Sequence, residues 1–437
     1  RTDHSHPLFK LVLWLYWRVF CQDFMIEALI GAFAAACCAL IFHRLIFDAA
    51  RPSRGWAVRC LAWATICGLL FSMNAEAGVW TWPLVTLEYL NIMGVLLFVM
   101  ASWQAIHKRS YALLAMATVL IGICCDDLGL IAVIAVALAL LLGRARDAAF
   151  RSIPVFRMLA VMSVCMVAVR LGYMYAPVVG TARPESLLSH LNLLPGRFAA
   201  GGWWKWIAWP LAFPVFHENA MPRLWTLAMP CVVTLLAVAH LWFWARALQG
   251  RLNRPVFVAI CLMIFAYGQV AGIVLGRVAV DGNDYLQQPR YMIRYAELLV
   301  ALLLMWAGSQ ERGLPHSWLR RIPTGISALA CVLLLAAQVP LSFHAWRTAP
   351  YQRAYQIQAA RQIDELAMHP ADDIECAPEL TVCAWSVQRR RELTRLLSDN
   401  RLNVFSPRVQ QRHTYLPALA PLPEEKKSPP PLLPKAT

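Results

Sequence analysis

The sequence has few charged residues. Only 15% of its 437 residues are Asp, Glu, Lys or Arg, whereas 59% are hydrophobic. Soluble domains carry about 25% charged and about 45–50% apolar residues, so this composition argues against a soluble protein. The mean hydropathy of +0.52 points the same way.

Motifs for nucleotide, metal and acyl chemistry are also missing. The chain has no Walker loop, His-Glu-x-x-His, Cys-x-x-Cys or Gly-x-Ser-x-Gly sequence. Their absence argues against an ATP-driven pump and against a serine hydrolase. Most of the 13 cysteines lie inside apolar runs, where cysteine serves as a small apolar residue. We therefore predict no cofactor and no dedicated metal site, and leave open only a divalent ion.

Long apolar runs dominate what is present. Ten segments cover about 24–46, 56–76, 84–106, 111–125, 128–143, 154–176, 224–245, 255–276, 292–309 and 323–344. A helix needs about 20 residues to cross a bilayer, and eight of the ten come close to that length. The short segments 111–125 and 128–143 flank Asp126 and Asp127, and form either one over-long helix or a hairpin. The sequence predicts an all-α, polytopic transmembrane helix bundle of about ten spans.

The positive charge is distributed as in membrane loops. The net charge of +15 comes from short basic clusters between apolar runs, which is typical of cytoplasmic loops and not of a nucleic-acid binder. All five basic loops lie on one side only if 111–143 is a hairpin that turns at Asp126 and Asp127. Both chain ends and the loops 77–83, 177–223 and 277–291 are then expected on the opposite, non-cytoplasmic side.

Three regions follow from this topology. Residues 1–344 form the transmembrane region, with an interfacial amphipathic helix at 7–20 and a periplasmic loop at 177–223. Residues 345–415 form a small periplasmic region with helices near 353–368 and 387–399 and a β-like run at 379–385. Residues 416–437 form a proline-rich tail that we expect to be disordered. Cys376 and Cys383, the only cysteines of the polar region, are predicted to form a disulfide in an oxidising compartment.

Several polar residues gather on the non-cytoplasmic side, where charges near span ends are functional candidates. Asp126 and Asp127 are either acid–base groups or N-caps of the helix that follows. Arg170 either extends to the interface or binds phosphate. Arg290 and Arg294 either anchor a span or present one helix face to a phosphate. The tryptophans at 203, 204, 206 and 209 form either an interfacial belt or a sugar platform.

The arrangement of short motifs resembles uncharacterised bacterial membrane proteins related to GT-C glycosyltransferases. The resemblance covers roughly residues 1–405 and rests on the start TDHSHP, the acidic turn ICCDDLGL, Arg170 with Tyr173, the PRY motif at 289–291, the paired cysteines of the tail and LNVF. It implies transfer of a sugar from a polyprenyl-phosphate donor to a cell-surface glycan, at the periplasmic face of a bacterial inner membrane.

The resemblance also assigns residue roles. Asp3 takes the place of the catalytic base, with Asp126 and Asp127 as alternatives. The residues expected to bind the donor are Arg170, His217, Glu218, Arg290, Tyr291 and Arg294. The chain departs from a full member because the first span is absent, and a catalytic acid upstream of residue 1 is the alternative to Asp3.

Two other functions remain open at this stage. One is a transporter or flippase of a lipid-linked or polar solute, which favours internal repeats and charges at the bilayer midplane. The other is a non-catalytic membrane scaffold of a polysaccharide-assembly system. We find no internal repeat, and the charges gather on one face, so the enzyme is the preferred interpretation.

Overall fold

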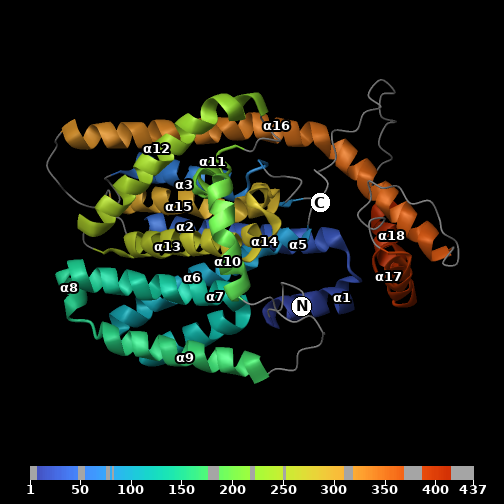
Figure 1. Cartoon of the computed structure of the whole chain (residues 1–437), viewed down its shortest axis with the longest axis horizontal. Helices are drawn as coiled ribbons and strands as arrows, with labels where there is room; N and C mark the ends of the chain where they lie inside the picture. The colour runs from blue at the N-terminus through green and yellow to red at the C-terminus, as the bar shows by residue number, and fades with distance from the viewer. Residues whose placement is uncertain are drawn as a thin grey trace. The chain divides into compact units, whose positions relative to one another are not determined.

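The computed structural model describes residues 7–47, 55–74, 79–80, 83–175, 187–216, 222–249, 252–309, 318–368 and 386–414. Every regular element in these stretches is helical (Figure 1). Within the described residues, eight helices are long and apolar enough to cross a membrane. The predicted all-α, multi-pass membrane protein is therefore confirmed.

The membrane helices follow the predicted apolar segments closely. They are α2 (Phe24–Phe47), α3 (Trp56–Leu70), α6 (Glu88–Lys108), α7 (Tyr111–Arg146), α9 (Val155–Tyr175), α12 (Pro222–Gln249), α13 (Arg254–Ile273), α15 (Met292–Ser309) and α16 (Trp318–Met368). The apolar stretches 56–70 and 111–125 fall below the length of a full span. The predicted span 323–344 and the predicted helix near 353–368 both lie within α16.

Helix α15 lies at the centre of the bundle. Its apolar stretch is 89% buried, whereas that of α16 is only 11% buried. Helix α13 packs along α15, and α3 packs on another side of it, as the near-parallel ribbons in Figure 1 show. Polar residues on α15 are therefore enclosed by protein.

The contacts of α7 show that it folds back on itself. A Cβ atom added to Gly129 would lie 2.5 Å from the carbonyl oxygen of Ile121. A straight helix would separate these residues by about 12 Å. In addition, Trp103, just before α7, and Phe150, just after it, lie with ring centroids 6.1 Å apart. The predicted hairpin is thus present, and Gly129 allows the close approach of its two arms.

Three of the basic loops meet at one end of the bundle. In the loop after α7, Asp147 caps α8 (Ala148–Arg151) by accepting the backbone N–H of Ala149 (3.0 Å). It also accepts the backbone N–H of Leu252 (2.8 Å), in the loop before α13. Asn253 caps α13 and donates to the carbonyl of Gly308 at 3.0 Å. We call this end, marked by Asp147, Leu252, Asn253 and Gly308, the basic-loop end.

The predicted loop 177–223 contains helices that pack into the bundle. They are α10 (Leu187–Arg197), the π-helix η1 (Phe198–Gly202) and α11 (Trp203–Ala212). The chain bends between them at Gly201, whose φ is +89°. Residues 208–213 are buried, and α11 contacts α12 and α15. Figure 1 shows this segment running across the direction of the long helices.

The chain forms two compact units, one of residues 1–10 and 28–342 and the other of residues 11–27 and 343–437. The second contains most of α1 (Pro7–Phe20), α17 (Val387–Asp399), η6 (Asn403–Phe405) and α18 (Pro407–Thr414). Asn403 donates its backbone N–H to the carbonyl of Cys21 (2.7 Å) and its side-chain N–H to that of Gln22 (2.9 Å). The predicted helix at 387–399 matches α17. Burial also raises the pKa of the Tyr16 phenol in this unit.

Candidate functional site

The most distinctive polar group of the first unit lies where the chain passes from α13 to α15. Here the π-helix η2 (Val274–Val278), α14 (Ala279–Asp281), and the 3-10 helices η3 (Asn283–Gln287) and η4 (Pro289–Tyr291) follow one another. Gly282 has a φ of +100°, a conformation open chiefly to glycine, and turns the chain between α14 and η3. These short helices bring Arg277, Tyr285, Arg290, Tyr291 and Arg294 together, and we call this set the arginine–tyrosine cluster.

Two arginines of the cluster share one aromatic ring. The guanidinium of Arg290 lies 5.3 Å from the ring centroid of Tyr291, and that of Arg294 lies 5.7 Å from it. Arg290 also lies 5.3 Å from the ring of Tyr285 and donates a hydrogen bond to its hydroxyl. The charge of Arg277 acts on the Tyr291 hydroxyl as well. A guanidinium over an aromatic face presents its N–H donors around its edge, in a geometry suited to phosphate.

A carboxylate pairs with one arginine of this cluster. Glu88, at the start of α6, lies 3.3 Å from Arg294, and their side chains are 17% and 23% exposed. Asn91 donates to the other Glu88 oxygen at 2.9 Å. The pair fixes Arg294 against α6. Since α6 ends near Phe150, the cluster lies at the opposite end of the bundle from the basic-loop end.

A second ion pair joins two residues that the sequence placed in different roles. Asp127, in the turn of α7, lies 2.9 Å from Arg170 of α9, and its side chain is 85% exposed. Asp127 therefore pairs with an arginine. Its acid–base and capping interpretations both stay predictions. Arg170 is 30% exposed, and its two interpretations, extension to the interface and phosphate binding, both stay predictions. A Cβ on Gly94 of α6 would lie 3.2 Å from the sulfur of Cys125, so this turn lies at the same end as the cluster.

The helices α10 and α11 hold η3, and with it Tyr285, in place. Arg197 donates to the carbonyls of Ala279 (3.2 Å) and Val280 (2.8 Å). Asn283 donates to the carbonyls of Arg197 (2.9 Å) and Ala200 (3.1 Å). Lys205 forms an ion pair with Asp284 at 2.8 Å. Sequence reasoning missed these contacts, because they join residues more than 75 positions apart.

The four tryptophans of this segment divide into two kinds. Trp206 donates to the side chain of Asn283 at 2.8 Å, and Trp209 is 6% exposed and stacks on Phe213. The buried Trp209 is therefore a packing group, and the half-buried Trp206 is fixed in place by Asn283. Trp203 and Trp204 are 59% and 39% exposed, so both of the original interpretations still apply to them.

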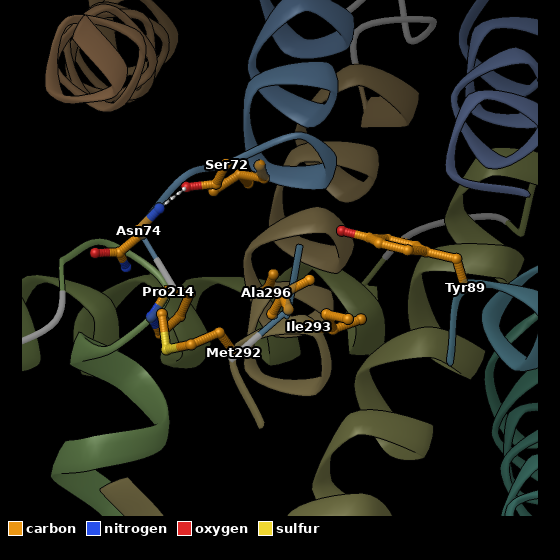
Figure 2. A pocket seen from close by; sticks show the side chains of 9 residues that line it. Ser72, Asn74, Tyr89, Pro214, Met292, Ile293 and Ala296 are labelled. Carbon is orange, nitrogen blue, oxygen red and sulfur yellow. Dashed lines mark hydrogen bonds between the residues drawn. The ribbon is translucent and has the colours of Figure 1, made fainter. Parts of the chain in front are cut away.

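A small cavity lies beside the cluster, between α3, α6, the end of α11 and α15. It is lined by Leu69, Ser72, Asn74, Val79, Tyr89, Pro214, Met292, Ile293 and Ala296, of which Figure 2 labels seven. The space open to the centre of a water molecule is about 20 Å³, which is room for about one water. Two of its polar groups already have partners, because Tyr89 donates to the carbonyl of Leu70 and Asn74 to that of Phe213. The cavity is too small for a sugar.

Several predicted site residues lie outside the described part of the chain. They are Asp3, His217, Glu218, Cys376 and Cys383, and the side chain of Asp126 is likewise not described. Their roles and the disulfide stay predictions. Among the residues that the structure does describe, no three His, Cys, Asp or Glu side chains come together as a metal site.

Two buried polar residues of the bundle were also missed. Glu297 of α15 is 5% exposed and accepts a hydrogen bond from Gln269 of α13 at 2.7 Å. The signal was present, since Glu297 interrupts the apolar run of a predicted span and an ionisable residue at membrane depth is a functional candidate.

No known protein family, curated protein or solved structure matches the chain. The fold and composition show a multi-pass membrane protein. Any more specific function has to be argued from the geometry of its own residues.

Proposed function

We propose that this protein binds the phosphate of a lipid-linked substrate at the arginine–tyrosine cluster. The observation that carries the proposal is the placement of Arg290 and Arg294 over the same ring of Tyr291. Two guanidinium groups held side by side suit the paired oxygens of a phosphate or diphosphate. Their position at the start of α15, at one end of the bundle, is where a lipid headgroup would lie.

The chemistry that fits this ligand is sugar transfer from a polyprenyl-phosphate donor. The leaving phosphate needs cationic stabilisation, which Arg290 and Arg294 would supply, with Tyr291 orienting both. The acceptor hydroxyl needs a general base, for which a carboxylate is suited. Asp3 is the first candidate for this base, and Asp126 and Asp127 are the others. The resemblance to GT-C glycosyltransferases gives the acceptor as a cell-surface glycan.

The proposed membrane is the bacterial inner membrane, with the cluster on its periplasmic side. This orientation is supported by the basic residues at the basic-loop end, which are typical of the cytoplasmic side. Polyprenyl-phosphate sugars are used on the periplasmic side in the enzymes that the sequence resembles. Asp127, Arg170 and the cluster would then face the same compartment.

One observation favours a second candidate function. Glu297 lies in the bundle interior, about one and a half helical turns into α15, and a buried carboxyl at this depth is common in transporters. A transporter or flippase would move the lipid-linked solute across the membrane without cleaving it. Formation of a glycosylated product by the purified protein would favour transfer, and its absence with intact lipid translocation would favour transport.

The binding test compares two arginine variants at opposite ends of the bundle. Purified protein in lipid nanodiscs is titrated with a short-chain polyprenyl phosphate. Loss of a charge-assisted phosphate contact costs about 1.5–3 kcal/mol, so R290A should weaken binding by roughly 10- to 150-fold. R290K should recover only part of the affinity, because an ammonium replaces a planar fork.

The matched control is R157A. Arg157 lies in an exposed position at the start of α9, near the basic-loop end, so this variant removes the same charge far from the cluster. Its affinity should equal that of the parent protein. Equal affinity of R290A and R157A, with both proteins folded, would refute the proposed phosphate site.

A further inference from the structure

A carboxyl group lies inside the bundle without the partners that an ionised carboxylate needs. Glu297 is 5% exposed, on the most buried of the membrane helices. One of its oxygens accepts the N–H of Gln269 at 2.7 Å. The other is buried and has no hydrogen-bond partner among the described residues.

Charged and titratable groups approach Glu297 from three helices. Arg294 lies one turn before it on α15, Glu88 approaches from α6, and Cys38 from α2. Gln269 on α13 is polar but does not titrate. Arg294 is the only cation of this set, and it forms its ion pair with Glu88 at 3.3 Å.

An ionised Glu297 would be a poor fit to these surroundings. A carboxylate in an apolar interior is costly unless it is paired with a cation and its oxygens are hydrogen-bonded. Here one neutral amide serves one oxygen, and the nearest cation is engaged with another carboxylate. A neutral carboxyl requires no counter-ion and carries its own O–H donor.

We propose that Glu297 is a proton-binding site in the interior of the transmembrane bundle, held by Gln269 and next to the Arg294–Glu88 pair. The site does not depend on phosphate binding at the cluster, although it borders it. Arg290 of η4 and Arg294 and Glu297 of α15 are spaced four and three residues apart, so they lie in a row from the bundle end inward. Protons would reach Glu297 along this row. In a transporter, Glu297 would bind the proton whose movement is coupled to that of the solute.

The test uses dicyclohexylcarbodiimide, which adds to protonated carboxyl groups in apolar surroundings. The purified full-length protein in detergent is treated near neutral pH, and the adduct on each acidic residue is quantified by peptide mass spectrometry. We expect adduct on Glu297 and little on the ion-paired Glu88. Once the pH exceeds the pKa of the carboxyl, labelling of Glu297 should fall by about tenfold per pH unit.

Two matched variants keep the proposal open to refutation. E297Q replaces a neutral carboxyl with a neutral amide of the same shape, so it should abolish the adduct at this position and leave Tm nearly unchanged. E88Q strips Arg294 of its counter-ion and should lower Tm clearly. Labelling of Glu297 no stronger than that of Glu88, or a loss of Tm in E297Q as large as that in E88Q, would overturn the proposal. Neither outcome would bear on binding of polyprenyl phosphate, which is measured separately.

Discussion

The two ends of the transmembrane bundle use polar residues in different ways. At the basic-loop end, Asp147 and Asn253 are bonded to backbone groups of neighbouring segments. At the cluster end, side chains also bond and stack with one another, as in the Arg294–Glu88 pair and in the two arginines over Tyr291.

In the proposed function, the arginines of the basic loops set the orientation of the protein in the membrane, whereas the cluster arginines bind the ligand. Arg144 at the basic-loop end also lies over a ring, that of Phe156, at 5.0 Å, but this stack involves a single arginine. Loop arginines need only remain on their side of the membrane. The cluster arginines are fixed in position by tyrosines and a carboxylate, and fixed donors are what ligand binding requires.

The largest expected effect concerns which end faces the cell exterior. In a cysteine-free background, D281C at the cluster end should react with a membrane-impermeant maleimide in intact spheroplasts. A148C at the basic-loop end should react only after permeabilisation. Both positions are exposed in the structure, so access depends on the membrane alone. Labelling of A148C in intact spheroplasts would reverse the proposed orientation.

The next effect contrasts polar contacts at the two ends. D147A removes bonds to two backbone N–H groups from a buried carboxylate, and should destabilise the protein by about 2–4 kcal/mol. Y295F at the cluster end loses only the bond from its hydroxyl to the carbonyl of Leu286 (3.0 Å), which is worth about 0.5–1.5 kcal/mol. Thermal unfolding in detergent measures both. A larger loss in Y295F would show that the cluster end carries more of the stability.

The last test concerns the hairpin that brings the basic loops together. G129A would place a methyl group 2.5 Å from the Ile121 carbonyl, and should cost about 1–3 kcal/mol through overpacking. The control is G172A on α9, where an added Cβ meets nothing within 4 Å. It should be neutral or slightly stabilising, since alanine favours the helix. Equal stability of the two variants would contradict the close approach of the two arms.

The sequence predicted the fold well and the site only in part. The apolar runs and the basic loops gave the membrane helices and the hairpin, because both reflect one-dimensional properties of the chain. Helix spacing also predicted that Arg290 and Arg294 share one face, and both lie over the ring of Tyr291.

The missing part of the site depends on long-range packing. No local pattern brings Glu88 to Arg294, Asp127 to Arg170, or Arg197 to the end of α14. The tryptophans show the same limit, since composition could not separate the buried Trp209 from the exposed Trp203. The aromatic-rich stretch of the loop 177–223 has no regular periodicity, so the sequence did not predict the helices there that pack into the bundle.

The bonds from Asn403 to Cys21 and Gln22 have a consequence for the synthesis of this protein. Asn403 follows Gln22 by 381 residues, and ribosomes add about 5–20 residues per second. The segment around Cys21 must therefore wait roughly 20–75 s for its partner, while the membrane helices between them are made. The second unit can form only when nearly the whole chain has been translated. Its folding is a late event, and its contact order is high however fast each helix forms.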